Sequence, residues 1–148
     1  MAVFVINEWL WADLSRDNGQ DRQLQAVNLI DSIGRSAHRI VIIEGTAFDR
    51  KAWNLCKAAG AIVQRIAGIY VSVIRQNSDR CQILKPEEIE DLTNELASMT
   101  KPDDHYLIQA LLAVEGAILV TTDNPLRESL SRAGLSCISR EEFLVTYF

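Results

Sequence analysis

Two aspartates in the second half of the chain stand at positions suited to chemistry. Asp104 stands at the start of the helical pattern DDHYLIQALLAV, and Asp123 directly follows the apolar strand pattern AILVTT. A right-handed crossover between these elements would bring the helix start near the strand end. Carboxylate oxygens are the ligands that Mg²⁺ and Mn²⁺ prefer, and such ions can activate water for attack on a phosphodiester. The segment therefore indicates metal-assisted hydrolysis.

Further oxygen ligands follow the other buried strands. Asn7 and Glu8 come directly after VFVI, and Glu44 comes directly after RIVII. Ligands of open α/β sheets bind outside the carboxyl ends of the strands, so these side chains are expected near the two aspartates. The sequence thus predicts a Mg²⁺ or Mn²⁺ site beside groups that orient water or phosphate. The predicted metal ligands are Asp104, Asp123, Glu8, Asn7 and Glu44, and the predicted catalytic residues are Asp104, Asp123, Asn7, Glu8 and Thr122.

Helix capping helps to separate function from scaffold around the two aspartates. Asp103 is well placed as the N-cap of the helix that begins beside it, because a short acceptor binds free backbone N–H groups. Asn124 is well placed as the N-cap of the next helix, with Pro125 at the favoured first position. Under this interpretation Asp104 and Asp123 have no required structural role and are free to bind a metal ion.

The remaining candidates have structural alternatives. Asn7 fits the N-cap of the helical pattern EWLWADL, and Glu8 fits a solvated acid in the first turn of that helix. For Glu44 and Asp49, a surface position or an interaction with a helix dipole competes with metal binding. The amide of Asn7 carries no charge, so it would bind Mg²⁺ more weakly than a carboxylate would.

Strand and helix patterns alternate along the whole chain. Short runs of apolar residues predict strands, and apolar residues at three- and four-residue spacing predict helices. The alternation predicts an α/β three-layer sandwich around a mostly parallel central sheet, with residues 1–148 as a single domain. The expected strands are Val3–Ile6, Arg39–Ile43, Cys81–Leu84, 117–121 and 135–139. The expected helices are 8–14, 24–33, 47–59, 61–75 (where GIYVSVI also fits a strand), 86–99, 104–114, 125–133 and 141–147.

The composition is that of an ordinary globular domain. The chain has 148 residues, a formal net charge of −5 and a pI near 5.0, which does not favour tight non-specific nucleic-acid binding. Three widely spaced cysteines without a CxxC motif predict free thiols in a reducing cytoplasm. No window of the sequence has the length and hydropathy of a membrane span, so no membrane partner is expected. The stretch GTAFDRKAW lacks the GK[ST] pattern of a phosphate-binding loop.

The segment DDHYLIQALLAVEGAILVTTDNPL resembles the carboxy-terminal half of a PIN domain, the PilT N-terminus nuclease fold, and VFVIN is similar to the first strand of that family. The resemblance implies metal-dependent cleavage of single-stranded RNA by three or four clustered acids. Asp104 and Asp123 match the later acids of the family, and Thr122 matches the hydroxyl residue beside the last acid. Asn7 stands where the family has its first aspartate. The second family acid is Glu44, Asp49 or has no counterpart.

Two hypotheses from different classes follow from these residues. The first is a metal-dependent endoribonuclease that acts as the toxin of a toxin–antitoxin pair, with single-stranded RNA and an antitoxin protein as partners. The alternative is a degenerate, non-catalytic PIN-like module that binds RNA or a partner protein, and a lysine counter-charge from Lys51 in the site would favour it. A third and weaker hypothesis is a generic α/β domain that binds a small ligand. Trp9 and Trp11 are expected in the core or at an interface. They lie two apart on one expected helix and cannot share a face, so the alternative is that one is exposed toward a homodimer or another partner.

Overall fold

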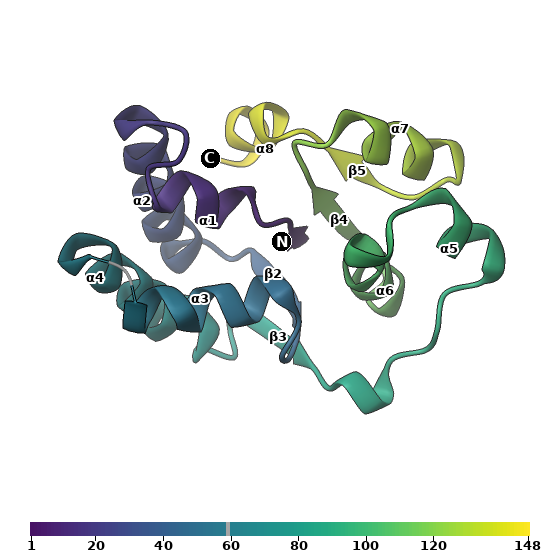
Figure 1. Cartoon of the computed structure of the whole chain (residues 1–148), viewed down its shortest axis with the longest axis horizontal. Coiled ribbons are helices and arrows are strands. Elements are labelled where there is room, and N and C mark those ends of the chain that lie inside the picture. Colours follow the sequence, from purple (N-terminus) through teal and green to yellow (C-terminus); the bar gives the residue numbers. More distant parts are fainter. Residues whose placement is uncertain (59) are drawn as a thin grey trace.

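The computed structural model describes residues 1–58 and 60–148, and it has an α/β architecture (Figure 1). Five strands in the described residues form one sheet in the order β3-β2-β1-β4-β5, and every neighbouring pair is parallel. The predicted sheet is therefore confirmed, and all of its pairs are parallel rather than most of them. The strands are β1 (Val3–Ile6), β2 (Arg39–Ile43), β3 (Cys81–Leu84), β4 (Ala117–Val120) and β5 (Cys137–Ile138).

The strand residues alternate between two hydrophobic clusters. Phe4 and Ile6 of β1 belong to one cluster, and Val5 between them belongs to the other. Ile42 and Ile43 of β2 divide in the same way. Successive side chains of a strand point to opposite faces of the sheet, so a fully apolar run buries both faces. This explains why VFVI and RIVII read as continuous apolar runs.

Helices cover both faces of the sheet. Residues of α1, α2, α3, α4 and α8 join the first cluster, and residues of α6 and α7 join the second, an arrangement compatible with a three-layer sandwich. Figure 1 shows α1 to α4 on one side of the strands and α6 and α7 on the other. The eight α-helices of the described residues are α1 (Trp9–Leu14), α2 (Gln20–Arg35), α3 (Ala47–Ala58), α4 (Ala61–Tyr70), α5 (Asn94–Met99), α6 (His105–Ala113), α7 (Asn124–Arg132) and α8 (Arg140–Tyr147).

The predicted helix at 61–75 is confirmed, although its end differs from an ordinary α-helix. After α4 the chain continues as a π-helical turn, η1 (Val71–Arg75), which places Ile74 and Arg75 in the interior. The predicted helix at 47–59 is confirmed as far as residue 58, and residue 59 lies outside the described residues. Within the described residues, no helix has the length and hydropathy needed to cross a membrane.

The single helix predicted at 86–99 is wrong. A short 3-10 turn, η2 (Pro86–Glu88), is followed by irregular chain, and α5 begins only at Asn94. Thr93 caps α5, since its hydroxyl accepts a hydrogen bond from the Leu96 N–H at 3.3 Å. One physical reason is charge: a continuous helix would stack Glu87 on Glu90 and Asp91, and like charges at this spacing destabilise a helix.

Both tryptophans of α1 are buried, so the expected core position is confirmed and the alternative that one of them is exposed is wrong. The indole N–H of Trp9 donates to the Val120 carbonyl at 3.0 Å, and that of Trp11 donates to the Phe48 carbonyl at 2.9 Å. The two rings lie on different sides of α1, and each meets a different part of the fold. These tryptophans therefore fix α1 over the sheet and offer no exposed ring to a partner.

A buried ion pair joins α1 to α8. The guanidinium of Arg140 donates to the Asp13 carboxylate at 2.9 Å, and the two side chains are 4% and 1% exposed. Asp13 also accepts a hydrogen bond from Asn18 at 2.8 Å, and Arg140 also donates to Gln25 at 2.6 Å. The Arg140 guanidinium lies 5.4 Å from the centre of the Trp9 ring. The charged atoms of Asp13 and Arg140 that form these hydrogen bonds are therefore buried away from water.

We expect Asp13→Ala to lower the free energy of unfolding by about 3 kcal/mol, because it leaves Arg140 buried without its counter-charge. Urea denaturation followed by tryptophan fluorescence measures the change. Asp17→Ala is the matched control, since Asp17 is exposed four residues away, and it should cost less than about 0.5 kcal/mol. Equal effects of the two substitutions would show that the buried pair does not stabilise the fold.

Candidate functional site

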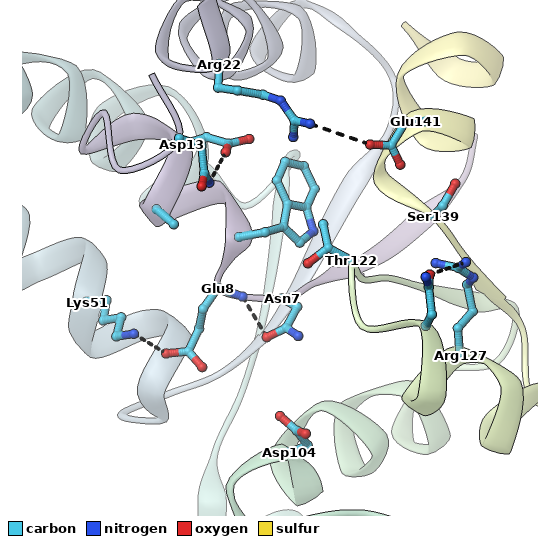
Figure 2. A pocket seen from close by; sticks show the side chains of 14 residues that line it. Asn7, Glu8, Asp13, Arg22, Lys51, Asp104, Thr122, Arg127, Ser139 and Glu141 are labelled. Carbon is cyan, nitrogen blue, oxygen red and sulfur yellow. Dashed lines mark hydrogen bonds and ion pairs between the residues drawn. The ribbon is translucent and has the colours of Figure 1, made fainter. Parts of the chain in front are cut away.

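The direction of chain progression across the sheet reverses between β1 and β4. The chain passes from β1 to β2 and β3 on one side, whereas β4 and β5 lie on the other. Crevices at such a switch point, outside the carboxyl ends of the strands, are the usual ligand sites of open α/β sheets. A cavity of about 890 Å³ opens at this place (Figure 2). Its lining includes Asn7, Glu8, Lys51, Asp104, Thr122 and Arg127.

Asn7 bridges the ends of the two central strands. Its side-chain N–H donates to the Thr121 hydroxyl at 3.1 Å, and its backbone N–H donates to the Val120 carbonyl at 3.1 Å. Its side-chain oxygen accepts from the Glu8 N–H at 2.7 Å. Glu8, and not Asn7, occupies the N-cap position of α1, so the interpretation of Asn7 as the cap is wrong. The amide is instead a cross-strand link whose oxygen and nitrogen are both engaged.

Glu8 points into the cavity and forms an ion pair. Its carboxylate lies 2.6 Å from the Lys51 ammonium of α3, and the two side chains are 28% and 55% exposed, respectively (Figure 2). As N-cap residue of α1, Glu8 makes no side-chain capping bond, so its carboxylate is free for this contact. The pair places a positive charge beside the predicted acid cluster.

Asp104 lies at the junction of a 3-10 turn, η3 (Pro102–Asp104), with α6. It occupies the N-cap position of α6 but makes no capping bond with its side chain, and the prediction that Asp103 is the cap is wrong. Within the described part of the chain, its carboxylate has no hydrogen-bond or ion-pair partner. Partial burial raises the pKa of Asp104, and the negative charges of Asp123 and Glu8 raise it further. The negative charges of Asp123 and Glu8 therefore both oppose the ionisation of Asp104.

Asp123 has a structural role that the sequence did not predict. It is the N-cap of α7, and its carboxylate accepts a hydrogen bond from the Leu126 N–H at 3.0 Å. Asn124, the predicted cap, is instead the first helical residue, and its side chain accepts from Arg127 at 2.6 Å. Asp123 also lines, together with Asp104, a smaller hollow of about 220 Å³ beside the main cavity. One carboxylate oxygen thus caps a helix, and the other is left for a ligand.

Glu44 and Asp49, the two candidates for a further acid of the site, both lie away from the cavity. Glu44 is exposed and does not line the cavity. Asp49 is buried, so its interpretation as a surface residue is wrong; it pairs with Arg75 at 2.7 Å and accepts from the Gly45 N–H at 3.0 Å. Asp49 therefore fixes the turn after β2. Among the described residues, no group of three or more His, Cys, Asp or Glu side chains is placed to hold a metal ion.

Two residues that the sequence did not single out lie next to the site residues. The hydroxyl of Thr121 is buried and accepts from the Asn7 side chain and from the Asp123 N–H, both at 3.1 Å. The Tyr106 hydroxyl has no hydrogen-bond partner among the described residues. Burial raises the pKa of the Tyr106 phenol, and the charges of Glu8 and Asp104 raise it further. The sequence signal for Thr121 is its place as the first hydroxyl residue of VTTD, directly after the predicted strand. No sequence pattern singles out Tyr106.

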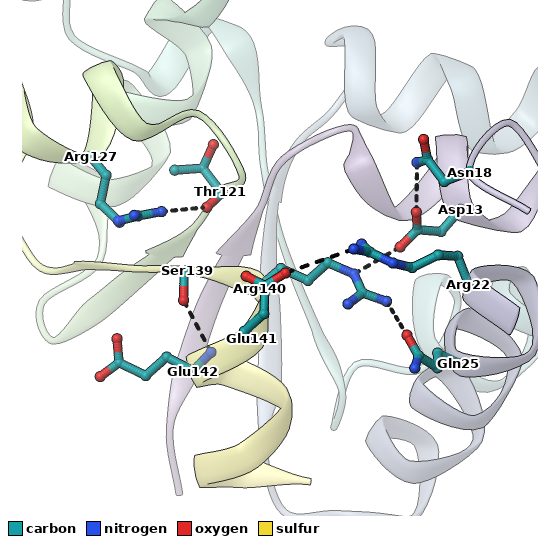
Figure 3. A network of polar contacts seen from close by, with 10 residues as sticks. All are labelled: Asp13, Asn18, Arg22, Gln25, Thr121, Arg127, Ser139, Arg140, Glu141 and Glu142. Atoms are coloured by element: carbon teal, nitrogen blue, oxygen red, sulfur yellow. Dashed lines mark hydrogen bonds and ion pairs between the residues drawn. The ribbon is translucent and has the colours of Figure 1, made fainter.

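The opposite wall of the cavity is built on the buried Asp13–Arg140 pair (Figure 3). Above it, Arg22 of α2 and Glu141 of α8 face each other at 4.0 Å. Arg127 of α7 lies on another side and donates to the Thr121 carbonyl at 3.3 Å. The cavity is therefore lined by the acids Glu8, after β1, and Asp104, at the start of α6, and by cationic side chains of α2, α3 and α7. Such a distribution suits an anionic ligand that lies beside a metal ion.

No protein-family model matches the chain, and a search of curated proteins finds no significant relative.

Asp104→Asn should stabilise the metal-free fold at pH 7, because it removes a carboxylate whose ionisation is opposed first by partial burial and then by the charges of Asp123 and Glu8. The pKa of Asp104 is raised on folding, so the penalty is absent below the ordinary pKa of 3.8, grows as the pH rises from 3.8 to the folded pKa, and is complete above it. We expect a gain of less than about 1 kcal/mol in this half-exposed site. Denaturation in EDTA at pH 3 and pH 7 measures it.

Asp103→Asn is the control for that experiment, because Asp103 is exposed and neighbours Asp104 in the chain. A gain of equal size in both variants, or the same gain at pH 3 as at pH 7, would contradict repulsion between the acids of the site.

Proposed function

We propose that the chain is a PIN-like, metal-dependent endoribonuclease that cleaves single-stranded RNA at the cavity between β1 and β4. The observation that carries the proposal is the pairing of Asp104 and Asp123 in one hollow at the switch point of the sheet. These two residues are also the ones that match the later acids of the PIN family. The raised pKa of Asp104, which Asp123 and Glu8 both increase, supports a shared electrostatic site.

The residues at this place fit a divalent cation of the Mg²⁺ or Mn²⁺ type. Mg²⁺ is commonly held by one or two carboxylates, with waters and substrate phosphates as the other ligands, so it does not need three acids in one group. Asp104 and the uncapped oxygen of Asp123 would hold it in the smaller hollow that they share, and Asp104 also lines the main cavity together with Glu8 and Asn7. When bound, the ion would supply the Lewis acidity for phosphodiester hydrolysis.

The chain itself would bind and orient the RNA. Arg22 and Arg127 line the cavity on two helices, where each could contact a phosphate group of the backbone. The exposed hydroxyl of Thr122 lines the same space and would donate to a phosphate oxygen or to the attacking water. In the hydrolysis, the water oxygen forms a new bond to phosphorus and an ester P–O bond breaks. The departing oxygen takes up a proton, which leaves a hydroxyl end and a phosphate end.

A non-catalytic PIN-like module is the second candidate, and one contact favours it. Lys51 neutralises Glu8 at 2.6 Å, where a catalytic cluster would use the acid for its metal. Asn7 supplies an amide where the family has an aspartate, and both ends of that amide are engaged by the chain. In this case the cavity would bind RNA, or a partner protein, without cutting. The antitoxin partner rests on the family resemblance alone, and the homodimer loses the exposed tryptophan from which it was predicted, because Trp9 and Trp11 are both buried.

RNA cleavage in Mn²⁺ by the purified chain tests the proposal. Asp104→Asn should abolish cleavage, whereas the exposed neighbour variant Asp103→Asn should keep it. Asn7→Asp should raise the activity by about tenfold, because a further carboxylate beside Asp104 and Asp123 strengthens cation binding by about 1.4 kcal/mol. The new carboxylate can accept a hydrogen bond from the Thr121 hydroxyl, so the strand link is kept.

The outcomes separate the two candidates. Cleavage by wild type that is lost only in Asp104→Asn supports the nuclease. An inert wild type with an active Asn7→Asp variant identifies a disabled nuclease and supports the module. If wild type and Asn7→Asp are both inert, the endoribonuclease proposal fails.

A further inference from the structure

Lys51 is the cationic side chain that reaches the acid edge of the cavity. It comes from the first half of α3, and its ammonium lies 2.6 Å from the Glu8 carboxylate. A lysine ammonium has three N–H donors, and among the described residues Glu8 is its only recorded polar partner. The side chain is 55% exposed and lines the cavity. Two donors are therefore left to face a ligand in that space (Figure 2).

The other side chains at this edge leave little capacity for a second metal ion. Asn7 is neutral, and its oxygen already accepts from the Glu8 N–H. Asp49 is buried against Arg75, and Glu44 lies outside the cavity. The three acids that remain are Glu8, Asp104 and Asp123, and Lys51 offsets the first of them. Lys101 lines the hollow beside Asp104 and Asp123, so the net negative charge there is smaller than that of the two carboxylates and suits one divalent cation rather than two.

We infer that Lys51 is the second cationic group of the site: its ammonium binds a non-bridging oxygen of the RNA phosphate, and the protein takes one divalent ion at Asp104 and Asp123. This inference rests on the proposed function and specifies which residues of the site bind the metal ion and which bind the phosphate. The metal belongs to the hollow shared by the two aspartates, and the phosphate contact belongs to Lys51 at the Glu8 side. Glu8 then acts as a positioning residue that holds the ammonium over the cavity.

The inference requires Lys51 to have opposite effects on the two ligands. Its charge repels a cation and attracts a phosphate, so Lys51→Met should bind Mn²⁺ more tightly and RNA more weakly. If the ion pair of Lys51 with Glu8 were purely structural, Lys51→Met would not have these opposite effects on the Mn²⁺ affinity and the RNA affinity. Arg50→Met is the matched control, because Arg50 is the preceding residue of α3, carries the same charge, is exposed and does not line the cavity.

Two measurements on the purified full chain test this. Titration with Mn²⁺, followed by calorimetry and electron paramagnetic resonance, should find one magnetically isolated ion per chain and an affinity about three- to tenfold higher in Lys51→Met. Fluorescence anisotropy with a short labelled single-stranded RNA in EDTA should show about three- to tenfold weaker binding by Lys51→Met. The slope of log affinity against log salt should also fall by about 0.7, the value for one lost phosphate contact on a single strand.

The results distinguish failure of the inference from failure of the proposed function. Two spin-coupled Mn²⁺ ions in wild type would overturn the role of Lys51 and leave the nuclease proposal standing. RNA affinity and salt slope in Lys51→Met that equal those of Arg50→Met would overturn it as well, as would the lack of any RNA binding by wild type. If wild type binds no Mn²⁺ at all, both the inference and the metal-dependent nuclease fail.

Discussion

The hydroxyl of Thr121 is the point on which the geometry of the site depends. It is buried at the end of β4, and it receives hydrogen bonds from the Asn7 side chain and from the Asp123 backbone. Parallel pairing of β1 and β4 brings these strand ends together, but pairing alone does not set where the side chains point. Through one oxygen, Thr121 fixes the amide that follows β1 and the turn that carries Asp123. The acids are arranged around this anchor.

Stability and binding make conflicting demands on these acids. Asp104 is half-buried near two other carboxylates and lacks the neutralising partners that the buried pairs Asp13–Arg140 and Asp49–Arg75 have. The charges of these two buried pairs are satisfied, whereas the carboxylate of Asp104, at the switch point of the sheet, has no hydrogen-bond or ion-pair partner among the described residues. Strain of this electrostatic kind is typical of positions that a ligand completes. Tyr106, a buried phenol beside the same acids, shows the same local imbalance.

The sequence predicted the order of elements well, because each strand is a short apolar run and most helices carry a regular apolar face. It failed at 86–99, where an apolar spacing typical of a helix was opposed by repulsion among Glu87, Glu90 and Asp91. It also misassigned all three caps near the site, those of α1, α6 and α7, and at the last two the true cap is an Asp beside the predicted Asp or Asn, residue types with nearly equal capping preferences. The burial of Asp49 depends on Arg75, which is distant in sequence, and no local pattern indicates such a pair.

The Asn7 amide has a consequence for how such a chain can change over generations. Codons for asparagine and aspartate differ by a single base, and the Thr121 hydroxyl can accept from an amide or donate to a carboxylate. The scaffold can therefore accommodate either residue at this position without rebuilding the strand ends. A single transition mutation would therefore exchange Asn and Asp at position 7, which changes the negative charge beside Glu8 by one and leaves the fold intact.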